Sequence, residues 1–177
     1  FTHKWNVTKQ LNDGRVDIRY DPHKDRYVFL TWKGNICHGA TGRSLDAEVK
    51  PKWFRYGASN TDVFTVPQYG RYGYPEYNGK KVAIVVEDCI SACAASAIAD
   101  GVALEGTTLM THQLAVLRDY DRVVIALDED ASAKALSMQA RLNAFVDTRV
   151  WLLNEDLKYR DENYIRRHGE VQVYGDH

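Results

Sequence analysis

Cysteine is scarce in this sequence, and the few that occur show no zinc-binding pattern. Only three are present, Cys37, Cys89 and Cys93, without the paired spacings of a zinc ribbon. Cys89 and Cys93 lie four positions apart in an apolar helical pattern, which predicts small buried thiols. An odd cysteine count also fits a reduced cytoplasmic environment better than a disulfide framework. We therefore expect no zinc site in this chain and a cytoplasmic location.

Long hydrophobic runs are also missing. No apolar stretch approaches the ~20 residues that a membrane-spanning helix requires, and no signal peptide opens the chain, so we predict no membrane partner. The chain has no internal repeat, no low-complexity tract and no initiator methionine, the last being consistent with an excised fragment. Its 177 residues are 45% hydrophobic and 11% aromatic, which predicts one folded domain or two small ones rather than disorder.

Net charge is nearly absent overall, but it is unevenly distributed. The formal charge is −1, yet residues 1–80 carry a net +5 and residues 81–177 a net −6. A basic half joined to an acidic half suits a polyanionic partner. Chance asymmetry is the alternative explanation.

The most informative stretch is 122–130, in which Arg122 is followed by five apolar residues and then by Asp128 and Asp130. Its β-branched residues predict a strand buried on both faces. A second run of this kind, 81–86, ends in Glu87. Acidic residues that follow parallel strands meet at one edge of a sheet, where Mg²⁺ can take carboxylate ligands. If the segment after residue 127 is extended, Asp128 and Asp130 point the same way. A solvated turn or a helix cap is the structural alternative.

The hydrophobic periodicity changes near residue 80. The first part contains alternating strand patterns and turns, whereas the second alternates strands with helices, which predicts a parallel sheet. The fold class is therefore α/β, a parallel sheet flanked by helices and preceded by a small, mostly-β (α+β) basic subdomain. The expected strands are 15–20, 26–32, 36–40, 81–86, 101–104, 122–127 and 148–153; the expected helices are 89–99, 106–117, 131–145 and 161–167. Asp88 is expected to cap the first helix, and Leu136, Ala140 and Ala144 to share one face of the third.

With these residues in place, the second half resembles the Toprim domain of bacterial-type primases, topoisomerases and several nucleases. The resemblance covers about residues 81–169 and rests on Glu87 after one strand and Asp128-Glu129-Asp130 after a later one. Asp88 stands where that family usually has glycine, while the 102–106 segment looks like its second strand and glycine turn. The resemblance implies that Glu87, Asp128 and Asp130 are catalytic and hold Mg²⁺ or Mn²⁺, with two ions expected.

The first half resembles the basic segment that precedes Toprim in DnaG-like primases of bacteria and phages. Gly42-Arg43 and Pro51-Lys52-Trp53 carry this resemblance. It implies that Arg43 and Lys52 bind template and nucleotide, with Lys50 and Arg55 as weaker candidates. Arginine suits bidentate phosphate contacts and lysine acts as a point charge, although any one of them could be a solvated surface cation. The predicted domains are 1–79, the basic subdomain, and 80–177, the Toprim domain.

The segment 155–162 resembles the final acidic segment of the primase family, which supports a second metal ion. Its register stays open. Asp156 is the match if the Asp-x-Lys step is aligned, and Asp161 with Glu162 if the last helix is. A helix start favoured by the dipole is the alternative. The tyrosine-rich segment 66–80 could stack unpaired bases or simply anchor a loop, while His38 and His112 are weaker candidates.

We therefore predict a phage primase core, located in the host cytoplasm, that joins ribonucleoside triphosphates on a single-stranded DNA template. A replicative helicase and a zinc-binding module outside this chain are the other expected partners. A Toprim nuclease would use the same carboxylates to hydrolyse nucleic acid, and a non-catalytic nucleic-acid-binding module would keep them without turnover. A topoisomerase is disfavoured because no nucleophilic tyrosine domain is recognisable.

Overall fold

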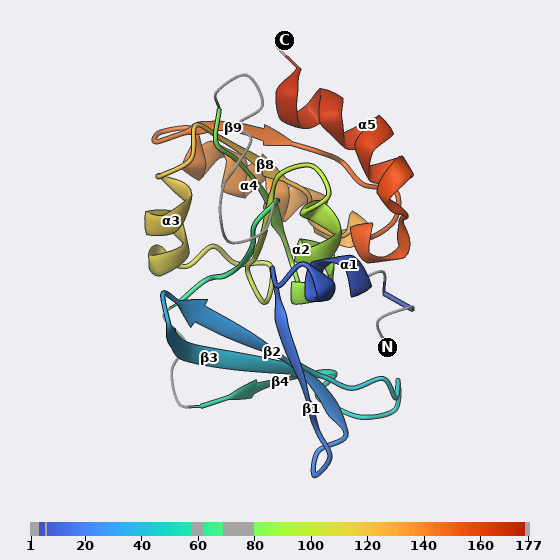
Figure 1. The fold of residues 1–177 in the computed structure, drawn as a ribbon. Coiled ribbons are helices and arrows are strands. Elements are labelled where there is room, and N and C mark those ends of the chain that lie inside the picture. The colour runs from blue at the N-terminus through green and yellow to red at the C-terminus, as the bar shows by residue number, and fades with distance from the viewer. Residues whose placement is uncertain (1–3, 6, 58–61, 69–79, 176–177) are drawn as a thin grey trace.

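Two β-sheets, one antiparallel and one mostly parallel, make up the framework of the chain (Figure 1). This computed structural model describes residues 4–5, 7–57, 62–68 and 80–175. The first sheet has the strand order β1-β2-β3-β4, and the second the order β5-β7-β6-β8-β9. The predicted fold class, a parallel sheet flanked by helices and preceded by a mostly-β unit, is confirmed.

The antiparallel sheet is a meander of four consecutive strands. These are β1 (Asp17–Asp21), β2 (Arg26–Lys33), β3 (Ile36–Arg43) and β4 (Trp53–Tyr56). The tight β2–β3 turn contains Gly34 at φ +59°, a conformation that glycine adopts without steric cost. β3 runs three residues beyond the predicted strand, so that Arg43 pairs with Trp53 of β4. A short helix that the sequence did not predict, α1 (Thr8–Asn12), precedes this sheet.

The second sheet contains four parallel strands and one antiparallel edge strand. The parallel strands are β6 (Val82–Val86), β7 (Asp100–Ala103), β8 (Arg122–Ile125) and β9 (Asp147–Val150). The edge strand β5 (Phe64–Val66) pairs with β7, although it lies in the predicted first domain, so the boundary at residue 80 stays a prediction. Most of the tyrosine-rich segment lies outside the described residues.

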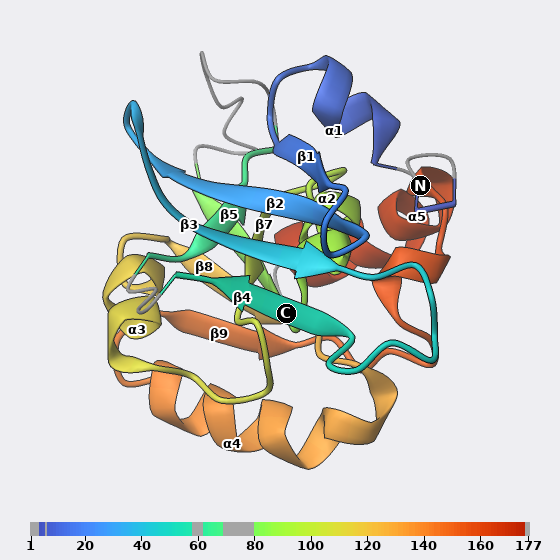
Figure 2. The same cartoon turned by 90° about the horizontal axis from the view of Figure 1, so that it is seen from below.

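The helices lie on both faces of this second sheet (Figures 1 and 2). They are α2 (Cys89–Ala95), α3 (Thr111–Leu117), α4 (Ser132–Leu142) and α5 (Glu162–Tyr174), with 3₁₀ turns η1 (Glu129–Ala131) and η2 (Leu157–Tyr159). α2, α3 and α4 are shorter than predicted and α5 is longer. None of the helices in the described ranges combines the length and apolarity needed to cross a bilayer.

The predicted apolar face of α4 is wrong. Ala135, Met138 and Leu142 are the buried side chains of this helix, whereas Leu136 is 54% exposed. Residues three, four and seven positions apart fall on one face of a helix, and several alanines made more than one such set compatible with the sequence.

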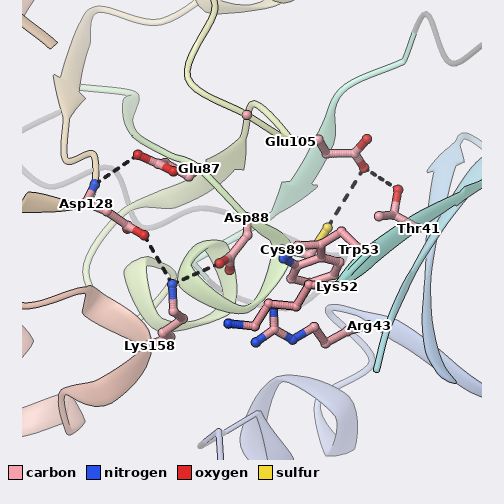
Figure 3. A pocket seen from close by; sticks show the side chains of 11 residues that line it. Thr41, Arg43, Lys52, Trp53, Glu87, Asp88, Cys89, Glu105, Asp128 and Lys158 are labelled. Carbon is pink, nitrogen blue, oxygen red and sulfur yellow. Dashed lines mark hydrogen bonds and ion pairs between the residues drawn. The ribbon is translucent and has the colours of Figure 1, made fainter. Parts of the chain in front are cut away.

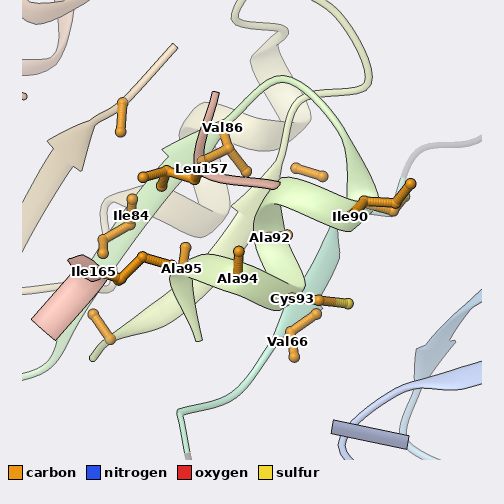
Figure 4. Close-up of a cluster of buried hydrophobic side chains, with 14 of the residues drawn as sticks. Val66, Ile84, Val86, Ile90, Ala92, Cys93, Ala94, Ala95, Leu157 and Ile165 are labelled. Carbon is orange, nitrogen blue, oxygen red and sulfur yellow. The ribbon is translucent and has the colours of Figure 1, made fainter. Parts of the chain in front are cut away.

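The central strands contribute alternate residues to two separate cores. In β6, Ile84 and Val86 face the core beneath α2 and α5, which Figure 4 shows, while Val85 faces the core beneath α3 and α4. β8 divides in the same way, with Val124 on the first side and Val123 on the second. Continuous apolar runs arise because both faces of these strands are covered. Because both faces are buried, each apolar run continues until the first charged residue, which is Glu87 after β6 and Asp128 after β8.

Helix α2 packs unusually close to β7 at Gly101. A Cβ atom at this position would lie 1.9 Å from the backbone oxygen of Ala92, a separation that real atoms cannot adopt. Gly169 of α5 is also crowded, but its nearest neighbours are the side chains of Ile98 and Trp151. Side chains can shift more easily than a helix backbone.

We predict that Gly101→Ala lowers the free energy of unfolding by roughly 3 kcal/mol or more, because α2 would have to move away from the sheet. Gly169→Ala is the matched control and should cost less, about 1–2 kcal/mol, since side chains can adjust. Urea denaturation of both variants measures the difference. An equal or smaller loss for Gly101→Ala would contradict this account of the packing.

Candidate functional site

A cavity of about 280 Å³ lies between the antiparallel sheet and the carboxyl edge of the parallel strands (Figure 3). One side is basic and aromatic and comes from β3 and the start of β4. The other side is acidic and comes from the segments that follow β6 and β8 and from η2. The lining residues are Thr41, Arg43, Lys52, Trp53, Glu87, Asp88, Cys89, Glu105, Gly106, Asp128 and Lys158.

Glu87 and Asp128 meet at the edge of the sheet, as the two strand patterns predicted. β6 and β8 are parallel neighbours, and the Oε1 atom of Glu87 accepts a hydrogen bond from the backbone N–H of Asp128 at 3.3 Å. Burial and the nearby Asp128 carboxylate raise the pKa of Glu87 to about 7. Burial also raises the pKa of Asp128, to about 6, because it outweighs the opposing effect of Lys158. Negative charge is therefore crowded at this edge.

Lys158 lies among the carboxylates. Its Nζ is 2.6 Å from Oδ2 of Asp156, 3.1 Å from Oδ2 of Asp88 and 3.2 Å from Oδ2 of Asp128. Its side chain is only 8% exposed. Burial lowers the pKa of Lys158, but the carboxylates, with Asp88 the largest contributor, more than compensate and raise it overall, so the amine is charged at neutral pH.

Asp88 has two roles in the structure. Its Oδ1 accepts a hydrogen bond from the backbone N–H of Ser91 at 2.8 Å, which confirms the predicted cap of α2. Its Oδ2 pairs with Lys158. The sequence indicated the first role, but neither the second role nor the central place of Lys158. The Asp-x-Lys spacing was the available signal, but it does not indicate which way the lysine points.

The expected extended geometry after β8 is wrong. Residues 129–131 form the 3₁₀ turn η1, so Asp128 and Asp130 do not point the same way. Asp130 is solvent-exposed and does not line the cavity, although its charge contributes to the raised pKa of Glu87. Acidic residues commonly begin helical turns, where they favour the N-terminal end of the dipole. The role of Asp130 as a metal ligand stays a prediction.

Arg43 and Lys52 line the same cavity as the carboxylates. Arg43 is 5% exposed, and its guanidinium lies over the rings of Trp53 and Trp5, at 5.2 and 5.9 Å from their centroids. Its buried Nε has no hydrogen-bond partner within the described part of the chain. Burial lowers the pKa of Arg43, but a guanidinium stays charged. Lys52 is exposed, and Arg43, burial and Lys158 lower its pKa.

Lys50 and Arg55 lie outside this cavity. Lys50 is exposed, and Arg55 pairs with Glu105, with 2.7 Å between Nη2 and Oε2. The other oxygen of Glu105 accepts a hydrogen bond from Oγ1 of Thr41 at 2.6 Å. Glu105, which the sequence did not indicate, thus joins strands β3 and β4 of the antiparallel sheet to the loop after β7. Its backbone has φ +55°, a conformation uncommon for a non-glycine residue.

The two alternatives for the final acidic segment are placed differently. Asp156 contributes to the carboxylate group around Lys158. Asp161 caps α5, where its Oδ1 accepts a hydrogen bond from the N–H of Tyr164 at 2.8 Å, and it is exposed. Glu162, in the first turn of α5, pairs with Lys9 and Arg166. The proposed metal roles of Asp156 and Asp161 stay predictions.

The two histidine candidates do not line the cavity that contains Glu87 and Asp128. Nδ1 of His38 is 2.7 Å from Asp62, whereas His112 lines a second cavity beside Arg55. The described ranges of the chain contain no group of three or more His, Cys, Asp and Glu side chains already arranged to hold a metal ion.

The chemistry of the acidic edge nevertheless fits a hard divalent cation. Carboxylate oxygens are the ligands that Mg²⁺ and Mn²⁺ prefer. Burial and neighbouring carboxylates raise the pKa values of Glu87 and Asp128, so a divalent cation would be favoured beside them. Asp88, Asp156 and one oxygen of Asp128 contact Nζ of Lys158, whereas Glu87 makes no such ion pair within the described ranges. Glu87 and Asp128 are therefore the residues best placed to hold such an ion.

We predict that the metal-free protein loses stability as the pH rises from about 5 to about 8, and that Glu87→Gln reduces this loss. The pKa of Glu87 rises from 4.5 to about 7 on folding, so between these values the folded state binds the proton more tightly. Its stabilising contribution is present below pH 4.5 and is lost as the pH passes 7. The difference should be on the order of 1 kcal/mol, because solvent partly screens this carboxyl group.

Urea unfolding in a chelator at several pH values measures this difference. Asp128 titrates in both proteins, so the comparison reports the titration of Glu87 together with its electrostatic coupling to Asp128. Glu48→Gln, at an exposed position, is the control and should leave the pH profile unchanged. If Glu87→Gln and the parent protein lose stability equally between pH 5 and 8, the electrostatic crowding at Glu87 has been misassigned.

Comparison with known proteins shows what this arrangement is similar to. Residues 84–163 match the family model described as Toprim-like. No curated protein sequence matched the chain. Among solved structures, the Aquifex aeolicus primase (zinc-binding and RNA polymerase domains) is similar at 21% identity and a TM-score of 0.59, over 92% of this chain and 43% of that one.

Two further structures agree with this result. The E. coli primase catalytic core is similar at 20% identity and a TM-score of 0.58, over 93% of this chain and 59% of that one. A DnaG primase catalytic domain bound to single-stranded DNA is similar at 18% identity and a TM-score of 0.51, over 92% of this chain and 56% of that one. This chain therefore spans about half the length of the primase chains that it matches. Residues 84–163 are Toprim-like, and the chain as a whole has the fold of DnaG-type primase catalytic cores, which confirms the predicted resemblance.

Proposed function

We propose that this chain is the nucleotidyltransferase core of a primase, which joins ribonucleotides on a single-stranded DNA template. The observation that carries the proposal is the composition of one cavity. A buried arginine without a hydrogen-bond partner for its Nε, Arg43, faces the same space as Glu87 and Asp128. An arginine in this state suits an anionic ligand, and the carboxylates suit its divalent counterion.

The basic and the acidic residues of the cavity would have different roles, phosphate binding and metal binding. Arg43 lies against two tryptophan rings and would bind phosphate oxygens bidentately, whereas the ammonium of the exposed Lys52 would add a point charge. Glu87 and Asp128 would hold Mg²⁺ or Mn²⁺, with Asp130 and the acidic segment as further candidates. When bound, such an ion lowers the pKa of an attacking hydroxyl and neutralises charge on leaving pyrophosphate.

The proposed partners follow from this chemistry. Arg43 and Lys52 can contact phosphates but cannot read base edges from this position, so binding to template should be salt-dependent and tolerant of sequence. A similar solved structure is a primase catalytic domain bound to single-stranded DNA, which supports this choice of template. A helicase, a zinc-binding module outside the chain, a phage origin and the host cytoplasm belong to the same proposal.

We predict that Asp128→Asn lowers ribonucleotide incorporation at least about a hundredfold, because it removes a charge that would hold the catalytic cation. The assay contains single-stranded DNA, labelled ribonucleotides and Mg²⁺ or Mn²⁺, with and without an annealed primer. Asp119→Asn, at an exposed position after α3, is the control and should retain activity. Undiminished synthesis by folded Asp128→Asn protein would exclude this assignment.

The same assay separates the competing functions. Lengthening only of an annealed primer would indicate a core that needs a separate initiation module. DNA that shortens without nucleotides, and stays intact with Asp128→Asn, would identify a nuclease. Salt-sensitive DNA binding without any chemistry would identify a non-catalytic binding module.

We also predict that Arg43→Gln raises the KM for nucleotide or the Kd for single-stranded DNA about tenfold or more, because it removes charge-assisted hydrogen bonds to phosphate. Arg43→Lys should restore binding only in part, since an ammonium cannot make the bidentate contact. Steady-state kinetics and fluorescence anisotropy give the two constants. Arg167→Gln, on the exposed side of α5, is the control; if it weakens binding as much as Arg43→Gln does, general electrostatics explains the effect.

A further inference from the structure

The ammonium group of Lys158 has the surroundings of a bound cation. Three carboxylate oxygens, from Asp88, Asp128 and Asp156, lie 2.6–3.2 Å from its Nζ. Asp88 precedes α2, Asp128 follows β8 and Asp156 precedes η2. Figure 3 shows the first two beside Lys158. An ammonium group has three N–H donors and no acceptor. One lysine thus satisfies three carboxylates, with one oxygen for each donor.

The fold holds Lys158 in this position. Leu157 is completely buried and packs in the core beneath α2 and α5, so η2 is fixed against α2. Lys158 follows within the same 3₁₀ turn and is itself buried. A flexible lysine on the surface could leave such a site easily. If Lys158 moved away, three buried or partly buried carboxylates would remain without a counter-charge. Such a separation of charges is costly in a protein interior.

The lysine does not neutralise the whole acidic edge. Glu87, Asp88, Asp128 and Asp156 can contribute four negative charges, against the single positive charge of Lys158. Glu87 makes no contact with Nζ among the described interactions; it bonds to the backbone of Asp128. The excess negative charge is therefore greatest between Glu87 and Asp128, in the same cavity whose opposite side Arg43 lines. One divalent ion can be held there without displacing Lys158.

We propose that the Lys158 ammonium group permanently occupies one of two cation positions at this edge, so that the chain binds a single divalent ion between Glu87 and Asp128. The inference rests on the proposed function, because it takes the acidic edge to be a cation site. It replaces the two ions expected from the sequence by one ion and one lysine. Asp88 and Asp156 then act as positioning residues that hold the lysine in place.

The test is the number of Mn²⁺ ions bound per chain, without nucleotide or DNA. Free Mn²⁺ is measured by electron paramagnetic resonance during a titration. The parent protein should bind one ion, and Lys158→Met should bind two, because the vacated carboxylates can accept a second. Lys158→Arg keeps the charge and should stay at one, as should the control Lys134→Met on α4. Two ions in the parent protein, or only one in folded Lys158→Met, would overturn the proposal.

A second variant covers the case in which Lys158→Met does not fold without metal. Asp88→Asn/Lys158→Met removes one negative and one positive charge together, and asparagine retains the side-chain oxygen that caps α2. This double variant should also bind two ions, through Asp128 and Asp156 at the vacated position. A count of one in the double variant overturns the proposal whatever the single variant does.

The outcome can be separated from a failure of the proposed function. An ion count that rises from one to two on loss of Lys158, in a protein that makes no primer, would support the role of the lysine and reject only the primase activity. Primer synthesis by a parent protein that binds two ions would support the activity and reject the role of the lysine.

Discussion

The parallel pairing of β6 with β8 is the constraint on which the site depends. Both strands are apolar on both faces and are buried between two cores, so the first polar residue after each strand must appear at the same edge. Those residues are Glu87 and Asp128. Hydrophobic burial, which has no direction of its own, thus brings two like charges together. The raised pKa values at this edge are the electrostatic consequence of that packing.

Elements distant in the sequence compensate for this charge. Lys158 comes from a 3₁₀ turn that is fixed to α2 by Leu157, and Arg43 comes from the antiparallel sheet. Glu105 joins that sheet to the loop after β7 through Thr41 and Arg55. The two sheets therefore meet at the cavity through polar contacts, while Phe29 of β2 and the buried Val7 and Val16 on either side of α1 join the apolar core below α2. The site exists only where both sheets contribute.

The sequence predicted structure well where burial imposes a hydrophobic pattern. It predicted less well the direction in which an individual polar side chain points. Apolar runs predicted β6 and β8 and the meeting of Glu87 with Asp128, and Asp88 was recognisable as a helix cap. The inward position of Lys158 could not be predicted, because a lysine next to a buried leucine normally points to solvent. The turn at Asp130 also has no distinct signal, since acidic residues suit both an extended ligand pair and the start of a helical turn.

The basic first half and the acidic second half of the chain both contribute charged residues to this cavity. The basic half contributes Arg43 and Lys52, the acidic half contributes the carboxylates, and the two groups face each other across open space. The charge of Asp88 acts to raise the pKa of Arg43, although the two side chains do not form an ion pair. If these two groups of cavity residues paired directly, they would neutralise each other and close the cavity. Because they remain apart, each side can take an ion of opposite sign, and a phosphate chain with its divalent counterion presents both signs in one ligand.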